Sequence, residues 1–250
     1  MLFRSAFISF VVGNRYFIDD VTTRMAELGI QVSGFFSTTA GEAMLYLDEQ
    51  ARDHTSVLID MGYLNTEVIG VEGDAVIYHK VIPAGGGDIA VALADELDIS
   101  LSAAEEIKRK FVYGIDSADD RFEVPGAEGE KATVFTRDQV KPVICKAVDE
   151  IAAELKEAID NDFGGLGNWS HVLMTGGGLS FNRGGREYLG GRLGRAVEDI
   201  PRRTTKLNSH SFSSSLGLMD LIIDTIEQQR APTGGFGSKV AGFFKSLLGG

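Results

Sequence analysis

The chain has 250 residues, of which 44% are hydrophobic and 24% are charged, a composition typical of a folded globular protein that excludes disorder along the whole length. Its formal net charge of −12 argues against a broad nucleic-acid-binding face, which requires a basic surface, but leaves nucleotide binding through backbone amides open. Cys145 is the single cysteine, so no disulfide can form within the chain, and a reducing cytoplasm fits best.

The N-terminal part of the sequence predicts two strands and two helices. Residues 5–12 are a short apolar stretch without a following cleavage site, which favours a buried strand over a signal peptide. An amphipathic helix is expected over 14–29, with Gly29 as its C-terminal cap. A second strand is expected over 31–36 and a short helix around 40–50. No apolar run reaches the ~18 residues that a membrane-spanning helix needs.

The next segment predicts a β-meander. Residues 56–60 have the character of a buried strand that ends in an acid, and a tight turn follows over 61–66. The chain resumes as a strand over 67–71, passes a hairpin signal, and forms a third strand over 75–82.

The central segment is expected to be mainly helical. An amphipathic helix is predicted over 88–97, and a second helix begins with Ser102 as N-cap and Glu105 completing a capping box. Residues 116–135 are polar and rich in glycine, with strand-like pieces and no assigned role. One long helix is predicted over 137–160, because its apolar residues fall on a single stripe.

The last third predicts one buried strand, one helix and a separate tail. The strand over 172–175 runs directly into glycines 176–178. A helix is expected over 215–226, and residues 228–235 have the composition of a linker. The last fifteen residues, 236–250, have the character of an appendage.

Two glycine-bearing turns suggest phosphate binding. Asp60 and Gly62 end a buried strand, with Asn65 and Thr66 just beyond; a carboxylate there can hold a hydrated Mg²⁺ while the turn presents amides to a phosphate. The alternative is an ordinary hairpin with an acid at its tip. The second turn lies at the start of the next helix, where exposed amides favour an anion, and is made of Gly85, Gly86 and Gly87. Its alternative is a flexible connection between strand and helix.

Two further features suggest nucleoside binding. Glu105 and Lys108 are spaced to share one helix face and could bind the two hydroxyls of a ribose, although the spacing taken alone favours a surface ion pair. Gly176, Gly177 and Gly178 follow a buried strand and lack Cβ atoms, so a planar base or a phosphate could lie against the backbone. A tight turn from strand to helix is the alternative.

The C-terminal tail carries an apolar stripe at helical spacing, with lysines on the other side. The stripe consists of Phe236, Val240, Phe243, Phe244, Leu247 and Leu248, and the lysines are Lys239 and Lys245. Such a helix suits a membrane interface, where the lysines would meet anionic headgroups. Docking on a protein groove remains open from the pattern alone.

The order and spacing of these features resemble the actin-like ATPase superfamily and, within it, the FtsA family of bacterial cell-division proteins. The matching segments are, in order, the second phosphate loop (57–62), a strand leading into a helix (80–86), the ribose- and adenine-contacting helix (104–108), the adenosine loop (173–178) and the final helix (214–218).

The resemblance implies an α/β fold with mixed sheets: an actin-like, ribonuclease H-like domain with an inserted small subdomain. It divides the chain into the end of an FtsA-type inserted subdomain (1–30), a remnant of the first actin-like domain (31–55), a second actin-like domain (56–212) that contains its small subdomain (83–165), a helix returning to the first domain (213–227), a linker (228–235) and an amphipathic membrane-targeting helix (236–250). The family's first phosphate loop, Asp-x-Gly-x-Ser/Thr, is not found, so a fragment of a longer protein is expected.

The resemblance also implies ATP and Mg²⁺ as cofactors, with Asp60 acting on the metal through a bound water. The family has glycines where this chain has Tyr63 and Leu64, and its second acid has only Asn65 and Glu67 as nearby candidates. We therefore expect weak ATPase activity or none, with nucleotide binding retained.

The implied function is that of an actin homologue that tethers the FtsZ ring at the division site. The expected partners are the C-terminal tail of FtsZ, bound by the small subdomain at 83–165, further copies of the chain in filaments, and anionic lipids on the cytoplasmic face of the membrane. The protein would be peripheral there, and no nucleic-acid partner is expected. Two alternatives are a pilus-assembly type of actin-like cytoplasmic adaptor and a small-molecule kinase of the same superfamily.

Overall fold

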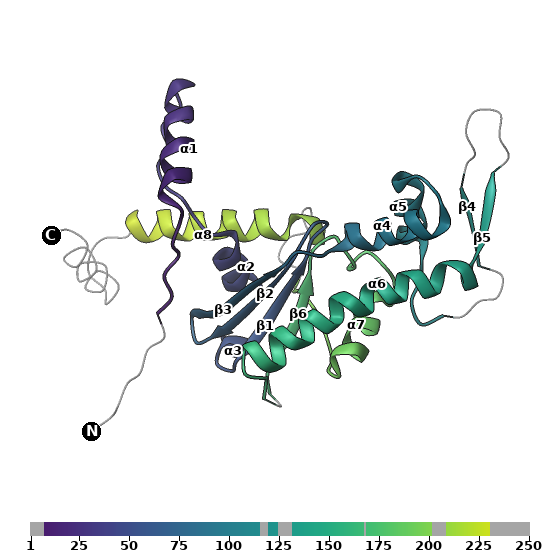
Figure 1. Ribbon diagram of the computed structural model, residues 1–250. Coiled ribbons are helices and arrows are strands. Elements are labelled where there is room, and N and C mark those ends of the chain that lie inside the picture. The colour runs from purple at the N-terminus through teal and green to yellow at the C-terminus, as the bar shows by residue number, and fades with distance from the viewer. Residues whose placement is uncertain (1–7, 116–119, 125–131, 168, 202–208, 231–250) are drawn as a thin grey trace.

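The structure is a computed structural model, and it describes residues 8–115, 120–124, 132–167, 169–201 and 209–230 (Figure 1). The helices are α1 (Arg15–Glu27), α2 (Thr38–Tyr46), α3 (Glu49–Arg52), α4 (Gly86–Leu97), α5 (Leu101–Lys110), α6 (Arg137–Glu157), α7 (Gly185–Leu193) and α8 (Ser213–Arg230). The strands are β1 (Ser56–Met61), β2 (Thr66–Glu72), β3 (Ala75–Ile82), β4 (Arg121–Val124), β5 (Thr133–Thr136), β6 (Val172–Thr175) and β7 (Glu198–Asp199). A π-helical turn follows α6 at Ala158–Asp162, and a 3₁₀ turn, His210–Phe212, precedes α8.

A five-stranded mixed sheet organises the fold, in the order β3-β2-β1-β6-β7. The first three strands form the predicted meander, since β1 pairs antiparallel with β2 and β2 with β3. The crossover from β3 returns the chain to the other side of β1, where β6 pairs in parallel. This register places Asp60 opposite both Glu67 on β2 and Thr175 on β6.

Side chains alternate between the two faces of the sheet, and each face has its own helices (Figure 1). Val57 and Ile59 of β1 point into the larger core, which α4, α5, α6 and α7 close. Leu58 points to the opposite face, where it packs with Leu47 and other residues of the α2 region. Asp60 has the same parity as Leu58, so its carboxylate emerges on the face covered by α2 and α8.

Helices α2 and α8 cross at two glycines. A Cβ on Gly41 would lie 2.4 Å from the carbonyl oxygen of Gly217, and a Cβ on Gly217 would lie 2.5 Å from the amide nitrogen of Glu42. Any side chain at either position would therefore force the two backbones apart. The crossing brings the first turn of α8 over the ends of β1 and β6.

The prediction of two strands near the N-terminus, over 5–12 and 31–36, is wrong for the described residues. Residues 8–13 and 31–36 have no strand pairing, and Phe10 and Val12 are 75% and 88% exposed. A strand needs a hydrogen-bonded neighbour for its backbone N–H and C=O groups, and within the described residues neither segment is paired with a strand of either sheet. Residues 5–7, the start of the first predicted strand, lie outside the described residues.

The predicted N-terminal helix is confirmed as α1, but it stands apart from the core (Figure 1). Asn14 caps it, since its Oδ1 accepts a hydrogen bond from the amide of Tyr16 at 2.9 Å. Gly29 takes a positive φ of 73° just past its end, as a C-terminal capping glycine does. No residue of α1 is buried.

The central helices differ in detail from the prediction. The predicted helix around 40–50 is two helices, α2 and α3. Ser102 is not the N-cap of α5; Ser100 is, and its Oγ accepts from the amide of Ala103 at 3.3 Å. Helix α4 ends at Leu97 as predicted, and Asp98 follows it in a left-handed conformation with φ of 52°. The N-cap of α5 therefore lies two residues before the predicted one, and Glu105 is left to form other contacts.

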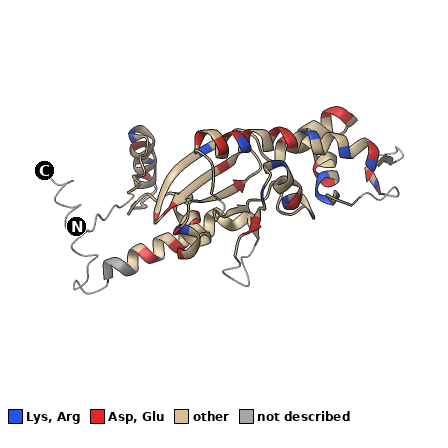
Figure 2. Ribbon diagram, turned by 90° about the horizontal axis from the view of Figure 1, so that it is seen from below, with Lys and Arg blue, Asp and Glu red and all other residues tan. Residues whose placement is uncertain are grey.

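The small hairpin β4-β5 and the N-terminal end of α6 lie at one extremity of the molecule, opposite α1 (Figure 1). The sequence did not predict α7 or β7. Figure 2 shows charged residues along several helices: α6 carries both acidic and basic residues, whereas α4 carries acidic residues alone. Among the described residues, no helix has the length and hydropathy needed to cross a membrane.

We predict that Gly217→Ala lowers the free energy of unfolding by about 1–3 kcal/mol, because the new methyl group separates α8 from α2. Urea unfolding followed by circular dichroism measures this change. The control is Gly191→Ala on α7, where a Cβ meets nothing within 4 Å. Equal stability of the two variants would contradict the tight crossing.

Candidate functional site

A cavity of about 650 Å³ opens at the end of the sheet where β1 and β6 stop. Its lining residues are Asp60, Gly62, Tyr63, Glu105, Lys108, Arg109, Gly176, Gly177, Phe181, Asn182, His210, Ser211 and Ser214. Six of the residues predicted from the sequence are brought together here: Asp60, Gly62, Glu105, Lys108, Gly176 and Gly177. They come from β1 and its turn, from α5, and from the loop after β6.

The remaining predicted glycines are not in the lining; they hold the loops against one another. The amide of Gly86 donates to the carbonyl oxygen of Gly62 at 2.9 Å, and that of Gly87 donates to Tyr63 O at 2.7 Å. The amide of Gly178 donates to Met61 O at 2.7 Å. These three amides are therefore occupied within the protein, which does not favour the predicted role of the start of α4 as a phosphate cradle.

Gly85, Asn65 and Thr66 also have internal partners. Gly85 donates its amide to Asp88 Oδ2 at 2.7 Å. Asn65 accepts the amide of Gly62 at 2.8 Å through its carbonyl oxygen. Thr66 is fully buried and donates its hydroxyl to Ala84 O at 2.7 Å. These contacts shape the turn after β1 and leave its opening toward the cavity to Gly62 and Tyr63.

Gly176 allows the loop after β6 to approach β1. A Cβ there would lie 2.2 Å from Met61 O and 2.3 Å from Asp60 Oδ1, and the residue has a φ of 89°. Both facts require glycine. The backbone of Gly176 and Gly177 consequently forms a part of the cavity surface without side chains, the bare glycine wall, beside the Asp60 carboxylate. The ring of Phe181 lies next to it in the lining.

Asp60 is half-buried and lies near two other acids, the buried Glu42 and the half-buried Glu67. Burial raises its pKa, and a hydrogen bond from Ser214 Oγ to Asp60 Oδ2 at 3.2 Å opposes that rise. Glu42 on α2 is 1% exposed, and its Oε1 has no hydrogen-bond partner. Burial, and next the charge of Asp60, raises the pKa of Glu42 to about 8. At neutral pH the structure therefore favours a protonated Glu42 beside Asp60.

Glu105 and Lys108 are not a surface pair. The Lys108 side chain is 3% exposed, and its Nζ donates to Gly86 O at 2.8 Å and pairs with Glu105 Oε2 at 2.7 Å. Glu105 also pairs with Arg109 at 2.8 Å. The ammonium group lies 5.3 Å from the ring centroid of Tyr63. Lys108 thus links α5 to Gly86 at the start of α4, while the carboxylate of Glu105 faces the cavity.

Sequence reasoning missed several lining or neighbouring residues, among them Glu42, Arg109, Phe181, Asn182, His210, Ser211 and Ser214. Glu42 carried a usable signal, because an acid within an apolar helix segment is unusual unless it is paired. Asn182 carried no signal in the sequence, because its side-chain amide donates to the carbonyl oxygens of Lys108 and Phe111, which are distant in sequence. The predicted membrane-binding residues at 236–248 lie outside the described residues.

Comparison with known proteins identifies the same family along the chain. A family model described as "Cell division protein FtsA" matches residues 57–234. The FtsA protein of Neisseria meningitidis serogroup B is 30% identical over 202 residues, which cover 72% of this chain and 45% of that protein. The chain thus spans less than half the length of this relative.

Solved structures confirm the actin-like fold. MreB5 of Spiroplasma citri bound to AMPPNP superposes with a TM-score of 0.67 at 13% identity, covering 87% of this chain and 68% of that one. The PilM-PilN type IV pilus biogenesis complex gives a TM-score of 0.56 at 21% identity, covering 80% of this chain and 56% of that one. At these identities the likeness concerns the fold alone.

We predict that Glu42→Gln stabilises the protein at high pH. The folded state binds the Glu42 proton more tightly than the unfolded state, so the free energy of unfolding falls as the pH rises from the ordinary glutamate value of 4.5 to about 8 and is level above it. Glutamine carries no charge and removes this loss.

Thermal and urea unfolding at pH 5, 7 and 9 test this expectation. The variant should match the parent near pH 5 and exceed it by on the order of 1–3 kcal/mol at pH 9. Glu106→Gln, at an exposed position on α5, is the control. A constant difference between Glu42→Gln and the parent at all three pH values would contradict the raised pKa.

Proposed function

Because the chain belongs to the FtsA family of bacterial cell-division proteins, we propose that it binds ATP with Mg²⁺ in the cavity and tethers FtsZ to the cytoplasmic membrane. The observation that carries the nucleotide proposal is the meeting of Asp60, the bare glycine wall and the Glu105–Lys108 pair around one cavity. A structure with the same fold, that of MreB5, is bound to AMPPNP.

The lining residues suit the parts of a nucleotide. The planar base would lie on Gly176 and Gly177 beside the Phe181 ring, because no Cβ intervenes. Glu105 would accept hydrogen bonds from ribose hydroxyls, with Lys108 holding the carboxylate in place.

The phosphates would then extend toward Gly62 and Asp60. Asp60 offers the oxygen donor that Mg²⁺ prefers, and across the described part of the chain no cluster of three metal-ligating side chains exists. Mg²⁺ would therefore be held mainly by water and phosphate oxygens, with Asp60 binding a coordinated water. When bound, it would neutralise charge on the phosphates. Protonated Glu42 would keep a second negative charge away from them.

Binding without fast turnover is the expected behaviour. The amides of Gly86 and Gly87 are hydrogen-bonded to carbonyl oxygens, so they do not supply the extra donors that stabilise charge in phosphoryl transfer. Tyr63 and Leu64 occupy the loop where the family has glycines. We propose weak ATPase activity or none.

The interaction roles that we propose rest on family membership. We propose that the small subdomain at 83–165, which includes α4, α5 and the β4-β5 hairpin, binds the FtsZ tail, and that copies of the chain associate into filaments. The amphipathic stripe at 236–248 would bind anionic lipids, making the protein peripheral at the division site. A pilus-type cytoplasmic adaptor is the alternative that the PilM fold match accommodates.

We predict that Gly177→Val lowers ATP affinity at least roughly tenfold with little change in folding stability. A Cβ at Gly177 comes no closer than 3.4 Å to Phe181, so the new side chain projects into the cavity rather than into packed protein. Isothermal titration calorimetry with ATP and Mg²⁺ measures the affinity. Gly191→Val, at an open position, is the control. Unchanged ATP affinity in Gly177→Val would contradict the placement of the base.

We predict that the full chain floats with liposomes containing anionic lipid and that a chain ending at Gly235 does not. Phe244→Glu should weaken membrane binding at least roughly tenfold, because one buried aromatic side chain contributes ~1.5–3 kcal/mol. Ser246→Glu adds the same charge on the opposite side of the stripe and should weaken it much less. Flotation of neither full chain nor truncation would favour the cytoplasmic adaptor.

A further inference from the structure

Helix α8 begins with three consecutive serines that meet three different environments. Ser213 is buried, Ser214 is half-buried and lines the cavity, and Ser215 is exposed. Because successive residues of a helix point about 100° apart, the first two can contact adjacent strands while the third faces solvent.

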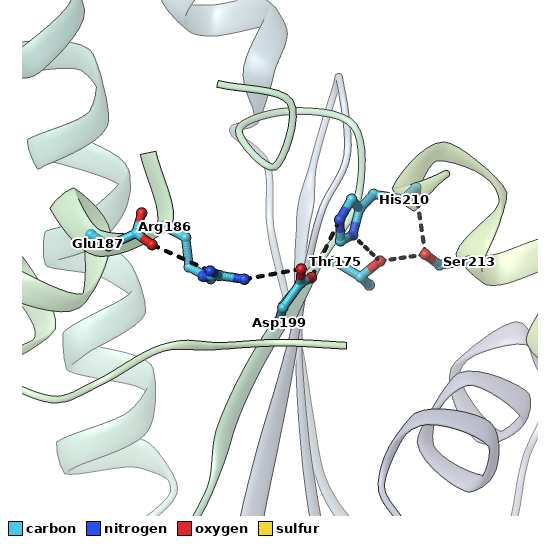
Figure 3. A network of polar contacts seen from close by, with 6 residues as sticks. All are labelled: Thr175, Arg186, Glu187, Asp199, His210 and Ser213. Atoms are coloured by element: carbon cyan, nitrogen blue, oxygen red, sulfur yellow. Dashed lines mark hydrogen bonds and ion pairs between the residues drawn. The ribbon is translucent and has the colours of Figure 1, made fainter. Parts of the chain in front are cut away.

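The two inner serines contact paired positions of the sheet. Asp60 and Thr175 are opposite each other in the parallel pairing of β1 and β6, and their side chains emerge on the face that α8 covers. Ser214 Oγ donates to Asp60 Oδ2 at 3.2 Å. Ser213 Oγ is hydrogen-bonded to Thr175 Oγ1 (Figure 3). The first turn of α8 is thereby attached to both strand ends at once.

The directions of the hydrogen bonds around Ser213 follow from counting hydrogens. Ser213 has one hydroxyl hydrogen and donates it to the carbonyl oxygen of His210 at 2.8 Å, so in its contact with Thr175 it accepts. Thr175 has then used its own hydrogen. His210 Nδ1, 3.4 Å from Thr175 Oγ1, must therefore be the donor in that contact.

The other side of His210 continues the network to more distant elements. His210 Nε2 lies 3.3 Å from Asp199 Oδ1 on β7, and Asp199 Oδ2 lies 3.1 Å from Arg186 Nη1 on α7 (Figure 3). Because Nδ1 already carries a hydrogen, the contact of Nε2 with Asp199 is an ion pair when His210 is protonated, and in that state the turn that precedes α8 is held from β6, β7 and α7 together. Ser213 is the member of this network on α8 itself.

We propose that Ser213 is a positioning residue: its hydrogen bond with Thr175 fixes the first turn of α8 so that the Ser214 hydroxyl stays on Asp60 and orients that carboxylate for the cation bound with the nucleotide. The proposal rests on the proposed ATP and Mg²⁺ binding, and it assigns Ser213, Ser214 and Thr175 a role in the dependence of affinity on Mg²⁺. Ser214 donates to Oδ2 of Asp60, while Oδ1 lies beside Gly176 of the cavity lining.

The test measures ATP affinity by calorimetry with Mg²⁺ and again with EDTA. The dissociation constant in EDTA divided by that in Mg²⁺ gives a ratio that states how strongly Mg²⁺ promotes ATP binding. Ser214→Ala should reduce this ratio at least roughly tenfold, the effect of losing one hydrogen bond to a charged group. Ser213→Ala should reduce it in the same direction by at least roughly twofold. Ser215→Ala is the same substitution one residue on, and it should leave the ratio unchanged.

A second pair of variants separates positioning from general stability. Thr175→Ser keeps the hydroxyl and should retain the parent ratio, whereas Thr175→Val removes it and should behave as Ser213→Ala does. If Ser213→Ala weakens ATP binding equally with Mg²⁺ and with EDTA, its role is structural only and the proposal fails. If the parent binds ATP but Mg²⁺ has no effect, the proposal fails while ATP binding stands. If the parent binds no ATP, the proposed function fails as well.

Discussion

The close crossing of α2 and α8 is the contact on which the candidate site depends. With glycine at both positions, 41 and 217, the two backbones touch, and the first turn of α8 comes down onto the ends of β1 and β6. That approach delivers Ser214 to Asp60 from one side, while α2 delivers Glu42 from the other. A wider crossing would open the wall of the cavity and leave the Asp60 carboxylate without its hydrogen-bond donor.

Glycines elsewhere in the site serve the same end of close approach between backbones. The turns after β1 and β3 and the loop after β6 are joined by amide-to-carbonyl hydrogen bonds between glycine-bearing segments, such as Gly86 to Gly62. These hydrogen bonds hold the loops of the cavity wall against one another, but they occupy backbone amides that could otherwise donate to an anion. A cavity built in this way suits holding a flat, extended ligand more than stabilising a developing charge, and this is the physical basis for proposing binding without fast turnover.

The electrostatics of the site follow from where the acids are buried. Asp60, Glu42 and Glu67 lie near one another, and burial together with their mutual repulsion raises the pKa values of Glu42 and Asp60. The folded protein reduces the repulsion by keeping a proton on Glu42, while Glu67 accepts hydrogen bonds from Thr39 at 3.1 Å and His79 at 2.9 Å. The consequence is less negative charge beside Asp60, at a place where a divalent cation and phosphates are proposed to meet.

The sequence by itself determined the β-meander, the long helix α6, the glycine loop after β6 and the family resemblance, because hydrophobic periodicity and glycine spacing are local properties of the chain. It also identified Asp60, Glu105 and Lys108 as members of one site. It could not show that Lys108 is buried, that the amide of Gly86 is already occupied, or that residues 8–13 and 31–36 lack a strand partner, since each of these depends on segments far apart in sequence. Only the tertiary structure decided which hydroxyl reaches Asp60. Three neighbouring serines look alike in sequence, and the crossing of α8 over the sheet distinguishes them by placing one on each strand end and one in solvent.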